Sequence, residues 1–149
     1  VATATPVETP TPTPAIGRCH TADLSATLKA SDSAAGTSYQ TLGLVNKSGH
    51  TCWVYGFPGI SLLDASGKQL GQPAARSGAA TTTVTLLAGG SAYSTLGFPN
   101  PGNFDPGTCS AQSTSLNIYP PDETAAIVVA DGKQACPGFS VTALSPTAP

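Results

Sequence analysis

The chain has 149 residues, which is enough for one ordinary domain and too few for two. Only 9% of the residues are charged, with six Lys and Arg against eight Asp and Glu, so a phosphate-facing surface for nucleic acid is excluded. The 16 Gly, the 14 Pro and the absence of Met argue against a helical bundle. Because 40% of the residues are hydrophobic, the chain as a whole is not of the disordered class.

Residues 1–18 form a low-complexity segment rich in Thr and Pro. Alternating Thr-Pro favours extended polyproline II and predicts a semi-rigid stalk of roughly 40–50 Å, although a frayed tail without a role is the alternative. We expect residues 19–145 to form the folded domain and 146–149 a tail. No apolar run is long enough to cross a membrane and no leader is left, so we expect that any signal peptide has been removed.

From Cys19 onward the hydrophobic pattern has a period of two, which predicts β-strands separated by Gly, Pro, Asn and Ser turns. The turn at Gly89-Gly90 predicts a hairpin between residues 83–87 and 92–98, and Asp131-Gly132 gives a second hairpin signal. Asn46 and Ser48 should satisfy backbone groups where a strand ends. The predicted strands are 24–30, 39–45, 52–57, 60–63, 83–87, 92–98, 116–119, 126–129 and 139–143.

Eight or nine short strands without an amphipathic helix predict an all-β fold, an immunoglobulin-like antiparallel β-sandwich. A closed barrel is the alternative. The four cysteines, Cys19, Cys52, Cys109 and Cys136, do not have zinc-ligand spacings. Their even number and wide spacing predict two disulfides formed in an oxidising compartment. Of three possible pairings we favour Cys19–Cys52 and Cys109–Cys136, because each pair flanks strands that are adjacent in the sequence.

Six short motifs are spread over residues 19–144. They are Cys19; Leu44 to Gly49 running into Cys52; Tyr55 to Ile60; Leu62-Leu63-Asp64 with Gly67; Leu86 to Ala92; and Leu116 to Pro121 between the last two cysteines. Together they resemble the bacterial secreted domain of unknown function 4232, which is common in actinobacterial exported proteins and lipoproteins. The resemblance implies a secreted, disulfide-bonded sandwich, often behind a Pro/Thr linker that follows a signal or lipobox. It implies no activity and no catalytic residues.

Catalytic and metal-binding patterns are weak in this sequence. His20 and His50 each lie near a cysteine and are weak metal candidates, but two imidazoles without Met or a close His pair make an incomplete site. No G-x-S-x-G motif supports a Ser nucleophile. Asp122 and Glu123 are the only adjacent carboxylates, and we expect them to be solvated turn residues. The sequence therefore predicts a non-enzymatic protein without a cofactor or a metal.

Two groups of residues are candidate binding sites. Trp53, Tyr55 and Phe57 alternate along one predicted strand, so they form either part of the core or an exposed aromatic platform for sugar rings or a partner. The second group lies in the Pro/Gly-rich loop that follows residue 97, which either caps the sandwich or recognises a partner. Its members are Phe98, Asn100, Asn103 and Phe104.

These features predict a secreted or cell-surface module that binds or builds structure without catalysis. The expected partner is an extracellular protein, a glycan or a second copy of the chain, and not nucleic acid. One alternative is a surface or fibre subunit in which the N-terminal segment pairs with the sheet edge of a neighbour. The other is a carbohydrate- or peptide-binding module.

Overall fold

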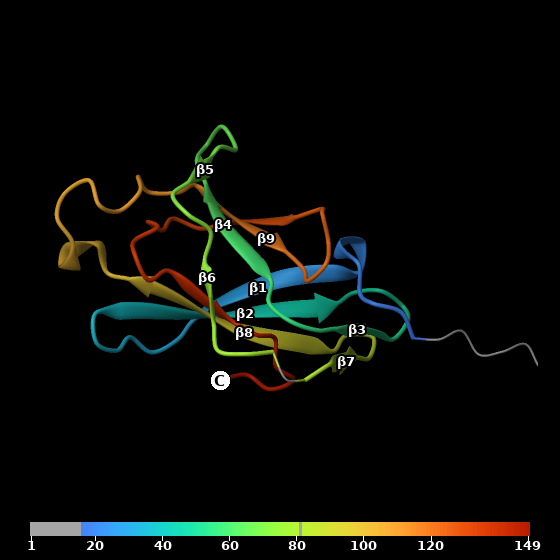
Figure 1. Ribbon diagram of the computed structural model, residues 1–149. Helices are drawn as coiled ribbons and strands as arrows, with labels where there is room; N and C mark the ends of the chain where they lie inside the picture. Colours follow the sequence, from blue (N-terminus) through green and yellow to red (C-terminus); the bar gives the residue numbers. More distant parts are fainter. Residues whose placement is uncertain (1–15, 81) are drawn as a thin grey trace, which may run out of the picture.

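The computed structural model describes residues 16–80 and 82–149, and Figure 1 shows strands throughout this part of the chain. Apolar and polar side chains alternate along most of the strands, because successive side chains of a strand point to opposite faces. The elements in chain order are η1 (Thr21–Asp23), β1 (Leu24–Ala30), β2 (Thr37–Asn46), β3 (Cys52–Val54), β4 (Gly59–Leu63), β5 (Gln69–Leu70), β6 (Ala75–Ser77), β7 (Val84–Leu86), β8 (Ser91–Pro99), η2 (Pro101–Asn103), β9 (Ser115–Tyr119), β10 (Ile127–Ala130) and β11 (Ser140–Thr142).

The strands form two main sheets and a small third one. The larger sheet has the order β1-β2-β8-β11-β6, the second has the order β10-β9-β4-β5, and β3 pairs with β7. In Figure 1 the layer with β4 and β9 lies across the layer with β1, β2 and β8, so the two sheets are stacked. The predicted all-β, mainly antiparallel fold is confirmed, and the sheets do not close into a barrel. One pair, β6 and β11, runs parallel within this otherwise antiparallel arrangement.

The core lies between the two stacked sheets. The four-stranded sheet contributes facing pairs, with Ile60 opposite Ile118 and Leu62 opposite Leu116. These four side chains are almost fully buried, as are Leu42, Leu44, Leu96 and Val141 from the larger sheet. Burial of such aliphatic side chains stabilises by about 1.5–3 kcal/mol each.

The connection between β7 and β8 is not a hairpin, so the prediction for residues 83–98 was wrong. The ladder places Trp53 opposite Thr85, and β8 pairs with β2 and β11 instead. The Gly89 N–H donates to the Asn46 carbonyl oxygen, and the Asn46 N–H donates to the Gly90 carbonyl oxygen, both at 2.8 Å. The Gly-Gly turn thus bonds to the end of β2. The small β3–β7 sheet has its buried apolar side chains at Cys52, Val54, Val84 and Leu86.

Asp131-Gly132 does not form a hairpin with the last strand either. β10 pairs back onto β9, whereas β11 lies between β8 and β6 in the larger sheet. Residues 71–80, which lie outside the strands predicted from sequence, contain the exposed edge strand β6. By contrast, the predicted turn after β4 is present, because the Asp64 carboxylate accepts hydrogen bonds from the Ser66 N–H and hydroxyl and from the Lys68 N–H. These bonds, that of the Ser66 hydroxyl first, lower the pKa of Asp64.

Candidate functional site

The predicted aromatic face ends at Gly56, where the backbone turns to a φ of +106°. Strand β3 stops at Val54, so the regular alternation that would carry Tyr55 and Phe57 on one strand face with Trp53 is interrupted. Tyr55 is 43% exposed and its hydroxyl donates to the Ala80 carbonyl oxygen at 3.0 Å. Phe57 is half-buried and packs against the core.

Trp53 holds the N-terminal segment against the sandwich. Its backbone N–H donates to the Gly17 carbonyl oxygen, and the Cys19 N–H donates to the Trp53 carbonyl oxygen. The indole Nε1 donates to the Ile16 carbonyl oxygen at 3.1 Å. The disulfide between Cys19 and Cys52 adds a covalent link at the same place. Residues 16–18, assigned to the linker from sequence, therefore form backbone contacts with β3.

Glu123 is the centre of an ion-pair network at this junction. Its Oε2 lies 2.7 Å from Arg18 Nη2 and 3.1 Å from His20 Nδ1. Its Oε1 accepts hydrogen bonds from the Thr21 N–H at 2.9 Å and from the Thr21 hydroxyl at 3.3 Å. Because the Glu123 side chain is only 12% exposed, the expectation of a freely solvated turn acid was wrong for this residue.

The network changes the acidity of the carboxyl group. The hydrogen bond from Arg18, followed by that from the Thr21 N–H, lowers the pKa of Glu123 from 4.5 to about 2, against the opposing effect of burial. His20 contributes in the same direction. The carboxylate is therefore the ionised partner that fastens residues 18–21 to the turn between β9 and β10.

The two histidines do not share a ligand set in the described part of the chain. His20 contacts Glu123, whereas the His50 carbonyl oxygen accepts hydrogen bonds from the side chains of Asn46 and Ser48. Residues 16–80 and 82–149 contain no group of three or more His, Cys, Asp and Glu side chains placed to hold a metal ion. The two histidine segments are thus held by separate sets of hydrogen bonds.

Phe98 is not part of an exposed recognition loop. It is 3% exposed, and its ring stacks on Phe139 with the centroids 4.9 Å apart. β8 continues through Pro99, so Phe98 belongs to a core strand, which corrects the loop boundary expected from sequence. Phe104, the other aromatic residue of this segment, is half-buried.

The two candidate asparagines of this loop fasten it to the start of β2 and to the turn before it. Asn100 Oδ1 accepts a hydrogen bond from the Ser38 hydroxyl at 3.2 Å. Asn103 Nδ2 donates to the Gly36 carbonyl oxygen at 3.0 Å. Both side chains are exposed, but these bonds position the loop and give each amide a partner within the protein.

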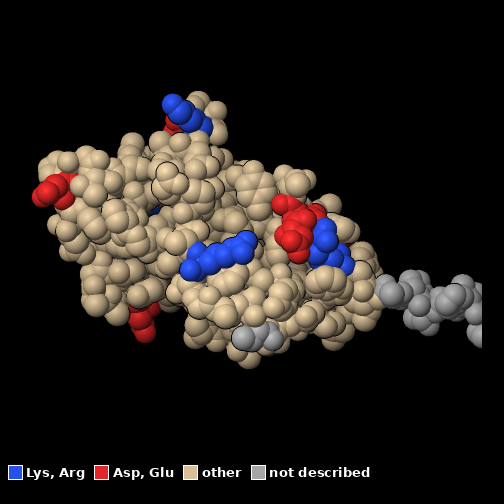
Figure 2. Space-filling model, viewed as in Figure 1, with Lys and Arg blue, Asp and Glu red and all other residues tan. Residues whose placement is uncertain are grey.

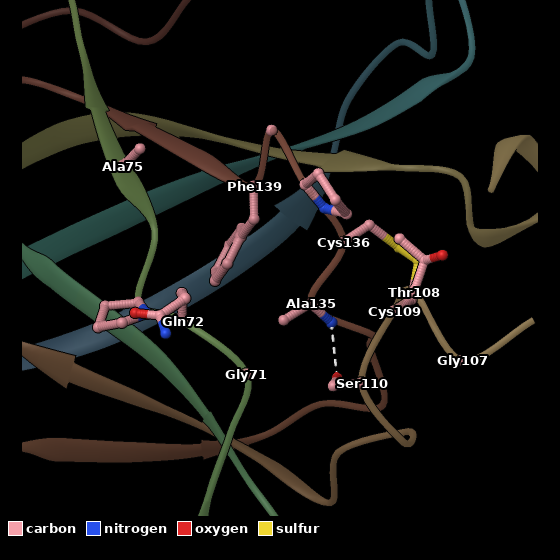
Figure 3. Close-up of a pocket in the computed structure, with 13 residues that line it drawn as sticks. Gly71, Gln72, Ala75, Gly107, Thr108, Cys109, Ser110, Ala135, Cys136 and Phe139 are labelled. Atoms are coloured by element: carbon pink, nitrogen blue, oxygen red, sulfur yellow. Dashed lines mark hydrogen bonds between the residues drawn. A yellow bond between two sulfur atoms is a disulfide. The ribbon is translucent and has the colours of Figure 1, made fainter. Parts of the chain in front are cut away.

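A cavity of about 550 Å³ lies beside the Cys109–Cys136 disulfide, and Figure 3 shows the residues around it. The Phe139 ring forms part of the wall, and Ser110 braces it by accepting a hydrogen bond from the Ala135 N–H at 2.8 Å. No charged side chain lines this cavity. Its lining residues are Gly71, Gln72, Pro73, Ala75, Gly107, Thr108, Cys109, Ser110, Ala135, Cys136, Pro137, Gly138 and Phe139.

A smaller cleft of about 280 Å³ lies where β6 passes the segment after β3. Unlike the larger cavity, it is lined by side chains of both charges, Arg76 and Asp122. The Arg76 guanidinium carbon lies 5.3 Å from the centroid of the Phe57 ring. Tyr55 lines the same cleft, so two of the three predicted aromatic residues take part in it.

Charged side chains are sparse on the surface. Figure 2 shows only a few separate groups of charged side chains on one face, and acidic and basic side chains adjoin most extensively on the right. Within the described ranges three ion pairs occur, and two of them share Glu123. No helix in these ranges is long and apolar enough to span a membrane.

Sequence reasoning identified Asn46 as a strand-ending residue, and the structure confirms that role and extends it. Asn46 is fully buried; its Nδ2 donates to the carbonyl oxygens of His50 and Leu86, and its Oδ1 accepts from the N–H and the hydroxyl of Ser48. Sequence reasoning missed Arg76 altogether. Its signal would have been an isolated cation in an otherwise uncharged segment, but the sequence did not show that Phe57 lies beneath it.

The chain is thus an all-β domain with two disulfides. The family model for the domain of unknown function DUF4232 matches residues 19–148, and the chain belongs to this family. The predicted cysteine pairing, Cys19–Cys52 and Cys109–Cys136, is also confirmed. The comparisons found no matching curated protein and no matching solved structure.

Proposed function

We propose that this chain is an exported, non-enzymatic binding module that its Thr/Pro-rich N-terminal segment tethers at the cell envelope. The observation that carries the proposal is the placement of the two disulfides. Cys19–Cys52 fixes the point where the N-terminal segment meets the sandwich, and Cys109–Cys136 borders the larger cavity. Disulfides of this kind persist in oxidising compartments, which supports export.

The cavity beside Cys109–Cys136 supports a binding role. Ligand sites are concave and mostly apolar with a few polar groups, and this cavity combines the Phe139 ring with the polar side chains of Gln72, Thr108 and Ser110. At Gly71 the backbone has a φ of +69°, and an added Cβ would lie 2.8 Å from the Ala135 Cβ, so a larger residue there would disturb this wall.

Export is tested by counting thiols in the protein recovered from its native cells. We expect denatured protein from the cell exterior to take up no maleimide before reduction and four equivalents after it. Protein found mainly in the cytosol with four reactive thiols would overturn the exported assignment.

Binding is tested with immobilised protein and extract of the native cell envelope. An A75W variant places an indole in the lining of the cavity, and A65W places the same side chain on the exposed turn after β4 as a matched control. We expect a component retained by the wild type and by A65W to be lost with A75W. Equal retention by all three proteins excludes this cavity as the binding surface, and no retention by any of them contradicts the binding role.

Self-assembly is a second candidate, and the edge strand β10 favours it. β10 ends the four-stranded sheet, and its residue Val128 is 60% exposed. An exposed apolar edge can accept a strand from a neighbour. We expect a V128K variant to abolish any concentration-dependent increase in the sedimentation coefficient, and a wild type that stays monomeric at all concentrations would rule this candidate out.

A further inference from the structure

We propose that the cleft lined by Arg76 and Asp122 binds a small carboxylate that also carries a hydrogen-bond donor. The proposal deepens the binding role proposed above and places a second site on the molecule, away from the uncharged cavity at Cys109–Cys136. The cleft is lined by Tyr55, Gly56, Phe57, Arg76, Ala80, Pro121 and Asp122. At about 280 Å³ it is smaller than the roughly 300–1,000 Å³ typical of sites for drug-sized ligands, which indicates a smaller occupant.

Arg76 supplies the cationic end of this site. Its guanidinium is held over the face of the Phe57 ring, which positions the charge, since the ring attracts a cation electrostatically. Arg76 forms no ion pair and no side-chain hydrogen bond with the part of the chain that the structure describes. The planar fork of N–H donors is therefore open to a ligand, and it matches the geometry of a carboxylate.

Asp122 supplies an anionic side chain in the same cleft. Its backbone is anchored, because the carbonyl oxygen accepts a hydrogen bond from Arg18 Nη2 at 3.3 Å, and its φ of +61° fixes a turn conformation. The Asp122 carboxylate is exposed and has no hydrogen-bond partner among residues 16–80 and 82–149. Although both residues line one cleft, they do not form an ion pair with each other.

The remaining wall contacts the apolar part of the ligand. The Tyr55 ring is exposed and is held by its hydroxyl bond to the Ala80 carbonyl oxygen, so it presents a fixed aromatic surface. Pro121 adds an apolar wall. A ligand with a carboxylate at Arg76, a ring or an apolar ring face against Tyr55 and a donor at Asp122 satisfies all three features.

The same arrangement disfavours a phosphate. A phosphate group carries more than one negative charge, and the Asp122 carboxylate in the same cleft repels it more strongly than it repels a single carboxylate. The group that donates a hydrogen bond to the Asp122 carboxylate is the ammonium in an amino acid and a hydroxyl in a sugar acid. Amino acids and sugar acids both combine a carboxylate with a hydrogen-bond donor, and the experiment distinguishes between them.

The experiment is a titration of the full chain, labelled with ¹⁵N, followed by amide chemical shifts. The probes are L-phenylalanine, which carries an ammonium, and D-glucuronate, which carries hydroxyls. The controls are L-phenylalaninamide and D-glucose, which lack the carboxylate. We expect saturable shifts of the amides of Gly56, Arg76 and Asp122 with at least one acid and none with its control, at millimolar affinity because the site is exposed.

Variants assign the effect to the two charges. R76Q should remove saturation, and R76K should weaken binding several-fold because an ammonium does not form the bidentate contact. D122N, in which Asn also tolerates the positive φ, should weaken the phenylalanine complex more than the glucuronate complex. The matched control is K29Q, which removes an exposed cation from β1 and should bind like the wild type.

The outcomes separate this site from the wider function. Saturation by phenylalanine alone identifies a zwitterion, and saturation by glucuronate alone identifies a sugar acid; each supports the proposal if R76Q loses it while its circular dichroism and Tm remain close to those of K29Q. No saturation with either acid, or equal binding by R76Q, overturns it. A retained envelope component together with such a failure would leave the binding role intact and reject only the carboxylate site.

Discussion

Asn46 ends β2 and connects three segments through its side chain. Its Nδ2 donates hydrogen bonds to carbonyl oxygens on the following turn and on β7, and its Oδ1 accepts a hydrogen bond from the Ser48 N–H. Because the side chain is fully buried, water cannot replace these bonds when it is removed. Glu123 has a similar connecting role at the surface, where it joins the N-terminal segment to the turn before β10.

We expect N46A to lower the free energy of unfolding by about 2–4 kcal/mol, because the carbonyl oxygens of His50 and Leu86 lose their donor and the bond to Leu86 is buried. Urea denaturation at neutral pH measures the change. The control is N117A on β9, a half-buried asparagine for which we expect a loss below about 1 kcal/mol. Equal losses in the two variants would show that the Asn46 network does not stabilise the fold.

The ionised form of Glu123 should make stability depend on pH. Because its pKa is lower in the folded state, about 2 against 4.5, the stabilisation is complete above pH 4.5 and is lost as the pH falls through 2. With allowance for solvent screening we expect E123Q to be about 1–2 kcal/mol less stable than the wild type at pH 7. The difference in the free energy of unfolding between E123Q and the wild type should become smaller as the pH falls from 4.5 to 2. Urea denaturation at a series of pH values measures it.

The control for this series is D32N, which changes an exposed aspartate in the turn between β1 and β2. Its difference from the wild type should stay nearly constant over the same range. A gap for E123Q that does not change with pH would mean that the ion pairs do not stabilise the folded state. No local pattern reveals this network, because Glu123 lies 102 to 105 residues from its partners in the chain.

Among the elements, the segment from β3 to β4 departs most from its predicted form. Gly56 turns the backbone to a φ of +106° and ends the alternation, which places Tyr55 and Phe57 in the cleft with Arg76. An added Cβ at Gly56 would meet no atom within 4 Å, so any cost of substitution comes from the backbone conformation alone.

We therefore expect G56A to destabilise the domain by about 1–3 kcal/mol. G49A is the matched control, because Gly49 also has open space around its Cβ position but lacks a positive φ. Thermal unfolding followed by circular dichroism compares the two. If both variants have the Tm of the wild type, the conformation at Gly56 is not strained for alanine.

The regular strands were the most predictable elements. The alternation in residues 24–30 and 116–119 gave strands that match β1 and β9 within one residue, because one face of each packs on the core. Pairing was less predictable. The Gly-Gly turn favoured a local hairpin, but the backbone bonds between that turn and Asn46 direct β8 away from β7. A turn motif indicates where the chain reverses and does not identify the strand that it joins.

At the scale of the whole molecule, the two disulfides differ in access to solvent. Cys19 and Cys52 are fully buried, whereas Cys109 is half-buried and lines the larger cavity. A thiolate must reach a sulfur atom to exchange with it, so access determines the order of reduction.

We expect Cys109–Cys136 to be reduced first when native protein is treated with increasing dithiothreitol. Alkylation and peptide mass mapping identify the labelled cysteines. Label appearing first on Cys19 or Cys52 would contradict this order.

Replacing both Cys19 and Cys52 by Ala should lower the free energy of unfolding by about 3.5 kcal/mol on the chain-entropy model.

The position of Cys19–Cys52 also has a mechanical consequence. Tension on the N-terminal segment passes through this covalent bond into β3, so residues 20–51, which include β1 and β2, lie outside the loaded path. Full extension of the unfolded chain should then fall short by the length of this loop, about 110 Å, and reducing agent should restore it in single-molecule pulling. While the Cys19–Cys52 disulfide is intact, a pulling force on the N-terminal segment therefore does not act along the chain of the first two strands of the domain.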